Sequence, residues 1–243
     1  MSREIERHEL HGKWVFLSAS YPAPERSCVY AEKADVRAIS NAVVELARAV
    51  FDAGGSLVFG GHPTISPLVL RIAESAEEPP GENGAPRVRV YQSAVFSGVE
   101  AEASKRIGQL RIGQQIATES VSGEHPIFRN GALAPESVTK SLDRMRRRMI
   151  EDNKPVAAVF IGGMEGVEDE YRIVAEYPDV RRYLVAGPGG AARILAEQGN
   201  PVAPDDAVED LTEALGHSQL FPWRMRSLVA DMGAQAAGQG SVS

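Results

Sequence analysis

The sequence is poor in cysteine and has no long hydrophobic run. Cys28 is its single cysteine, which excludes an internal disulfide and favours a reducing compartment. No apolar stretch follows the charged first residues, and none approaches the roughly 20 residues that a membrane-spanning helix needs. We therefore expect a cytoplasmic protein that is neither secreted nor embedded in a membrane.

An excess of basic residues is also missing. The chain carries 26 Lys and Arg residues against 33 Asp and Glu residues, a formal net charge of -7. This balance argues against a nucleic-acid partner bound through a positive field. The histidines are scattered without the spacing of metal ligands, so we expect no metal and no other cofactor. They are His8, His11, His62, His125 and His217.

The composition is that of a globular protein with a full core. Hydrophobic residues make up 43% of the 243 residues and charged residues 24%. This length fits one large domain, which we place at residues 1–232. Residues 233–243, "GAQAAGQGSVS", are low in bulk and are expected to form a flexible C-terminal tail.

Five apolar runs predict β-strands. Three of them are almost continuously apolar, which is typical of strands covered on both faces. The predicted strands span residues 13–19, 56–61, 87–93, 155–163 and 182–187.

Helical patterns separate these runs, at 36–50, 65–72, 135–153, 167–177, 188–198, 206–216 and 222–232. Strands that alternate with helices imply parallel pairing through right-handed crossovers. The sequence thus predicts an α/β fold, a Rossmann-like three-layer sandwich with a mostly parallel central sheet. Residues 94–134 do not fit this alternation and read as a long ordered excursion.

Small residues gather where the predicted strands end. Ser18 and Ser20 end the first strand, and strands two and five run into "GGHP" and "GPGG". The fourth runs into "GGMEG", residues 162–166. Ligands of open parallel sheets lie at this edge, where glycine allows close backbone approach and helix N-termini attract anions. We therefore expect an anion-binding cleft that includes Gly60, Gly61, His62, Gly162, Gly163, Met164, Glu165 and Gly166.

Two charges fall on apolar helix faces. Arg146 lies within the arc that Val138, Met145 and Met149 define, and Glu170 lies within the apolar face of the helix that opens at Val167. An inward charge is costly unless it is paired or bound to a ligand. Two interpretations follow: the residues pair with each other, or the guanidinium binds phosphate while the carboxylate binds ribose.

The stretch "IGGMEGVEDE", 161–170, resembles the PGGxGTxxE motif of the Lonely Guy (LOG) phosphoribohydrolases. These enzymes belong to the SLOG superfamily, and the chain looks closer to its nucleotide-sensor branches. The resemblance covers about residues 13–200. It implies a catalytic role for Arg146 and Glu170, and a phosphate cradle at Gly162, Gly163 and Gly166. It also places the Ser18 and Ser20 loop and the Gly60 and Gly61 loop near the ligand.

Departures from this motif favour binding over hydrolysis. Ile161 stands in place of the motif's proline, one residue is added at Met164 or Glu165, and Val167 replaces a phosphate-binding threonine. The leading hypothesis is a SLOG-type domain that binds a nucleotide or NAD-derived signal similar to ADP-ribose, in bacterial stress or antiviral signalling. The alternative is a nucleotide N-glycosidase of the LOG type. The resemblance also implies a homo-oligomer.

Overall fold

The computed structural model describes residues 9–75, 85–129, 132–200 and 221–239. Its centre is a sheet of six parallel strands in the order β4-β3-β2-β1-β7-β8. The strands are β1 (Trp14–Ser20), β2 (Ser56–Gly60), β3 (Val88–Ser93), β4 (Gly113–Thr118), β7 (Ala157–Gly162) and β8 (Arg181–Val185).

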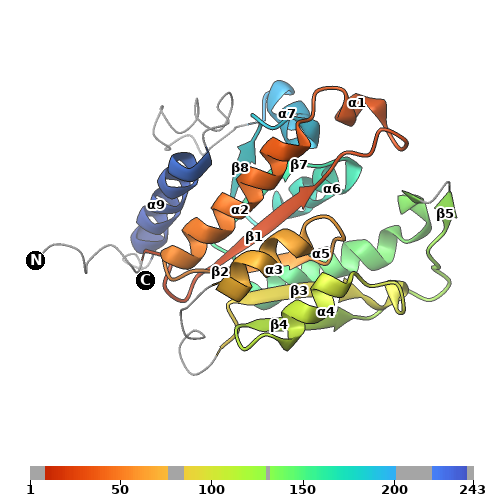
Figure 1. The fold of residues 1–243 in the computed structure, drawn as a ribbon, viewed down its shortest axis with the longest axis horizontal. Helices are drawn as coiled ribbons and strands as arrows, with labels where there is room; N and C mark the ends of the chain where they lie inside the picture. The colour runs from red at the N-terminus through yellow and green to blue at the C-terminus, as the bar shows by residue number, and fades with distance from the viewer. Residues whose placement is uncertain (1–8, 76–84, 130–131, 201–220, 240–243) are drawn as a thin grey trace, which may run out of the picture.

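Helices cover both faces of this sheet (Figure 1). The longer ones are α2 (Val36–Asp52), α3 (Ser66–Ser75), α4 (Glu102–Gln109), α5 (Thr139–Asn153), α6 (Glu165–Val174), α7 (Gly190–Glu197) and α9 (Phe221–Gln239). Short elements are α1 (Cys28–Ala31), two 3-10 turns at Ala94–Phe96 and Pro135–Ser137, and a hairpin of β5 (Phe128–Arg129) with β6 (Ala132–Leu133).

Two apolar clusters hold the three layers together. Residues of α2, α3, α4 and α9 pack on one face of the sheet, and residues of α5, α6 and α7 pack on the other. Strand β7 is buried along its whole length, as its unbroken apolar sequence predicts. The predicted Rossmann-like α/β sandwich is confirmed, with a central sheet that is parallel throughout.

Helix α2 shows how the sequence sets an element's limits. Its N-cap is Asp35, whose carboxylate accepts hydrogen bonds from the N–H groups of Arg37 and Ala38 at 2.9 and 3.0 Å. These two hydrogen bonds satisfy backbone N–H groups that the first turn of a helix otherwise leaves without acceptors. Inward residues such as Ile39, Val43 and Leu46 then bury one face completely.

Two predictions differ from the structure. The predicted excursion at 94–134 contains α4 and β4, and β4 extends the sheet at its edge. Helix α9 continues to Gln239, so residues 233–239 are helical where a flexible tail was expected. A Cβ atom at Gly233 would lie 2.8 Å from Cβ of Glu9, which shows that this part of α9 is packed.

The helix predicted at 206–216 lies outside the described residues, as do residues 240–243. Across the ranges that the structure describes, no helix combines the length and hydrophobicity needed to cross a membrane.

Candidate functional site

The strand order places the site between β1 and β7. The chain after β1 passes to β2 through α2 on one face, and the chain after β7 passes to β8 through α6 on the other. Open α/β sheets bind ligands at such a reversal, beyond the carboxyl ends of the strands. Ser18 pairs in register with Phe160, and Ser20 pairs with Gly162 at this edge.

The turn from β7 into α6 needs its glycines. Gly162 and Gly163 have φ values of +64° and +83°, and a Cβ atom at Gly163 would lie only 2.1 Å from Val167. The N–H of Gly163 donates to the carbonyl of Ser20 at 2.8 Å, and its carbonyl accepts from Ala191 at 3.0 Å. The peptide is therefore fixed between β1 and α7 and serves the fold.

Two amides at the start of α6 remain open. Its N-cap, Met164, provides no side-chain cap, because its sulfur accepts a hydrogen bond from the N–H of Ala23 at 3.4 Å. In the described part of the chain, no group accepts from the N–H of Glu165 or Gly166. Such amides, at the positive end of a helix dipole, suit an anion.

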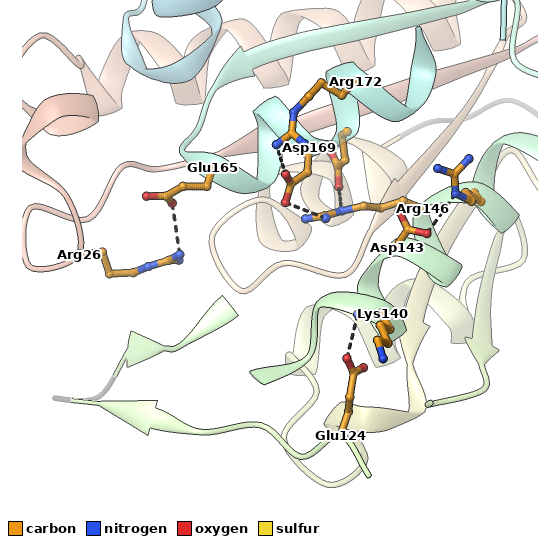
Figure 2. A network of polar contacts seen from close by, with 10 residues as sticks. Arg26, Glu124, Lys140, Asp143, Arg146, Glu165, Asp169 and Arg172 are labelled. Atoms are coloured by element: carbon orange, nitrogen blue, oxygen red, sulfur yellow. Dashed lines mark hydrogen bonds and ion pairs between the residues drawn. The ribbon is translucent and has the colours of Figure 1, made fainter. Parts of the chain in front are cut away.

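Arg146 is buried beneath this turn, as its helical position predicts. It is 7% exposed, and its Nε lies 3.4 Å from Oε1 of Glu170. Its Nη1 donates to Oδ2 of Asp169 at 3.2 Å, and Asp169 also pairs with Arg172 (Figure 2). The structure therefore brings Arg146 and Glu170 together, as the pairing interpretation expects.

Two nitrogens of Arg146 are left without a hydrogen bond. Nε is buried and has no partner of hydrogen-bond geometry among the described residues, although Oε1 of Glu170 lies 3.4 Å away. No described group pairs with Nη2 of Arg146. This nitrogen lies beside the first turn of α6, since a Cβ atom at Gly166 would come within 3.2 Å of it. Glycine at this position therefore leaves room for the guanidinium. Nη2 and the open amides of α6 therefore lie close together around the first turn of α6, and this arrangement of donors is suited to an oxyanion.

Burial raises the pKa of the Glu170 carboxyl above its ordinary value, and the Arg146 guanidinium and the Ser18 hydroxyl oppose this rise. The Ser18 side chain points to the α5 and α6 face, and its residue is only 1% exposed. Its Oγ forms no bond of hydrogen-bond geometry with any described group. A buried hydroxyl without a partner is costly, and a ligand atom is one means of satisfying it.

The loop after β2 is largely occupied by the protein itself. A Cβ atom at Gly60 would lie 3.2 Å from Met145, and one at Gly61 would lie 2.4 Å from Oε1 of Gln92. Nδ1 of His62 lies 2.9 Å from the hydroxyl of Thr64, and burial lowers the pKa of His62 to about 4, with Arg26 contributing. These residues lie at the predicted edge, where His62 is a neutral hydrogen-bonding group of its turn.

Sequence reasoning missed Arg26 and Asp169. Arg26 lies in the segment between β1 and α1, and its Nη2 is 3.5 Å from Oε2 of Glu165. Asp169 binds the buried Arg146. A helical wheel could have flagged Asp169 as the neighbour of Glu170, whereas the irregular segment around Arg26 carries no periodic signal.

Comparison with known proteins identifies the family of this chain. A search of curated proteins found no match. The SLOG cluster3 family matches residues 29–221, which include β2, the β7 turn and both Arg146 and Glu170. With this match over most of its length, the chain belongs to the SLOG cluster3 family.

Proposed function

We propose that this SLOG domain binds a nucleotide or NAD-derived ligand of the ADP-ribose type at the carboxyl edge between β1 and β7. A phosphate would contact the open amides of Glu165 and Gly166 together with Nη2 of Arg146. Ribose hydroxyls would donate hydrogen bonds to Glu170. Membership of a SLOG family supports a nucleotide-related domain in general terms.

The observation that carries this proposal is a set of unused polar groups where α5 and α6 meet the ends of β1 and β7. Nε of Arg146 and Oγ of Ser18 are buried without a partner of hydrogen-bond geometry among the described residues. No described group accepts from Nη2 of Arg146 or from the N–H groups of Glu165 and Gly166. Native proteins leave few buried polar groups unpaired, so Nε and Oγ together with these open donors support a polar ligand there.

Ser18 provides the sharpest test. Ser18→Ala removes a buried hydroxyl that lies near the Glu170 carboxyl without a partner of hydrogen-bond geometry, so we expect the variant without added nucleotide to melt close to the wild-type temperature. A panel containing AMP, ADP, NAD and ADP-ribose isomers should include a ligand that raises the melting temperature of the wild type. The same ligand should give a smaller rise with Ser18→Ala. A flat response of the wild-type protein to the whole panel would refute nucleotide binding.

A second candidate function is cleavage of an N-glycosidic bond. It is favoured by Glu170, a carboxyl of raised pKa in direct contact with an arginine. Such a group can protonate a leaving base or stabilise an oxocarbenium ion. Release of free base from nucleoside monophosphates or NAD, abolished by Glu170→Gln, would establish this activity. Ligand binding without any base release would favour sensing.

We also propose an oligomeric state and a cellular role for this domain. We infer a cytoplasmic homo-oligomer acting in bacterial stress or antiviral signalling, with base selection by the 94–134 segment. Light scattering after size exclusion chromatography measures the mass of the assembly. A monomer at all tested concentrations, with and without the stabilising nucleotide, would contradict the oligomer.

A further inference from the structure

A second arginine lies at the start of α6. Arg26 follows β1, and its guanidinium pairs with Glu165, the first residue of α6. The two side chains are 24% and 46% exposed. Figure 2 shows Arg26 and Arg146 approaching this helix from different sides, with Glu165 directed at Arg26 and Asp169 directed at Arg146.

The pair of Arg26 and Glu165 is loose. Its nearest atoms are 3.5 Å apart, through a single contact. Two other arginine pairs are much closer, at 2.7 Å for Arg106 with Glu74 and 2.6 Å for Arg147 with Glu176, whereas Arg144 with Glu119 is longer at 3.9 Å. A carboxylate at 3.5 Å neutralises the guanidinium without satisfying its fork of donors.

Arg26 also lies between two of the strand-end loops. Its charge acts on His62 after β2, while its ion pair reaches Glu165 after β7. The N–H of Ala23 in the same segment donates to the sulfur of Met164. The segment after β1 therefore lies against the first turn of α6, beside the open amides and Ser18.

We propose that Arg26 is a second anion-binding residue of this site, and that Glu165 holds the place of a ligand phosphate in the free protein. On binding, the phosphate displaces Glu165 from Arg26 and gains a bidentate contact. Arg146 and the α6 amides bind one phosphate and Arg26 binds another. The inference rests on the proposed function and specifies its ligand as a nucleoside diphosphate rather than a monophosphate.

The test compares two substitutions of opposite charge. Calorimetric titration with ADP and with AMP is carried out on the full chain, on Arg26→Ala and on Glu165→Gln. We expect Arg26→Ala to weaken ADP binding by about tenfold or more, because both charge-assisted hydrogen bonds of the bidentate contact are lost. AMP binding should change little. Glu165→Gln should strengthen ADP binding, because it removes the competing carboxylate.

The matched controls are Arg106→Ala and Glu74→Gln, which break an ion pair outside the β7 turn and should leave both affinities unchanged. Melting of each free variant verifies that it folds, and Arg26→Gln serves if Arg26→Ala does not. If Arg26 and Glu165 only hold the segment in place, both substitutions weaken binding, and the inference is overturned. It is also overturned if neither substitution changes ADP affinity. A wild-type protein that binds neither nucleotide refutes the diphosphate ligand, and the full panel then decides whether nucleotide binding itself survives.

Discussion

Arg146 and Glu170 meet in the interior, with Nε of the arginine 3.4 Å from Oε1 of the glutamate. The position of the Arg146 guanidinium is fixed, because Asp169 accepts a hydrogen bond from Nη1 and the helix backbone at Gly166 lies beside Nη2. One guanidinium thus faces two carboxylates of successive residues. The arrangement fixes the direction of Nη2, from which no described group accepts a hydrogen bond.

Loss of this arginine should be costly. Arg146→Ala leaves Asp169 and the buried Glu170 without their shared cation, and we expect a loss of about 3 kcal/mol in unfolding free energy. Urea denaturation monitored by circular dichroism measures it. The control is Arg147→Ala on the same helix, whose side chain is 34% exposed and whose ion pairs are screened by solvent. Equal losses for the two variants would show that Arg146 is no more than a surface charge.

Glu170 should make stability depend on pH. Burial raises its pKa above the usual 4.5, so the folded protein holds this proton more tightly than the unfolded chain does. As pH rises above 4.5, the unfolded chain gains more from ionisation, and the folded state loses stability. We expect Glu170→Gln to be more stable than the wild type at pH 7.5 and to lose this advantage below pH 4.5. An advantage that is independent of pH would contradict the raised pKa.

His62 should make the stability of the protein depend on pH in the opposite direction to Glu170. Its pKa is lowered from 6.5 to about 4, so the unfolded chain binds a proton at a pH where the folded protein does not. The stability that this group contributes is complete above pH 6.5 and is lost as pH falls toward 4. Proton NMR of the imidazole should give a titration midpoint well below 6, and His62→Gln should lose less stability than the wild type between pH 7 and 5. A midpoint near 6.5 would refute the assignment.

A glycine packed against the β7 turn should tolerate substitution by alanine less well than a glycine on the surface. Gly190 has φ +68°, and a Cβ atom there would lie 2.7 Å from the carbonyl carbon of Gly162. Gly123 has φ +85° but nothing within 4 Å. Gly123→Ala should cost about 1–2 kcal/mol through backbone strain alone. Gly190→Ala should cost clearly more, because backbone of the β7 turn cannot yield, and chemical denaturation of both variants makes the comparison.

The sequence predicted the parts of the fold that are buried. Strand β7 follows from its unbroken apolar run, and the inward faces of α5 and α6 follow from apolar residues at helical spacing, because burial imposes both patterns. The inward positions of Arg146 and Glu170 emerged from the same reasoning as exceptions on otherwise apolar faces. Their contact confirms that both side chains point inward. Their roles toward a ligand stay predictions.

Other parts carried no such signal. Strand β4, "GQQIAT", lies at the sheet edge and is only partly buried, so its sequence is polar and does not read as a strand. Arg26 lies on an irregular segment, where neither helix nor strand period applies. Its partner Glu165 is close only because the strands β1 and β7 are neighbours in the sheet, and that relationship belongs to the tertiary structure.

Because β1 pairs with β7 in the middle of the sheet, a break in the chain between them would separate the two halves of the site. Ser18 and Arg26 come from the first half of the chain, whereas Arg146, the α6 turn and Glu170 come from the second. A break between β4 and α5 would yield two fragments, each with one wall of the site and a central strand that has lost one of its two neighbours. Reassembly of those fragments would restore both walls at once, so nucleotide-dependent complementation would report directly on the β1 and β7 junction.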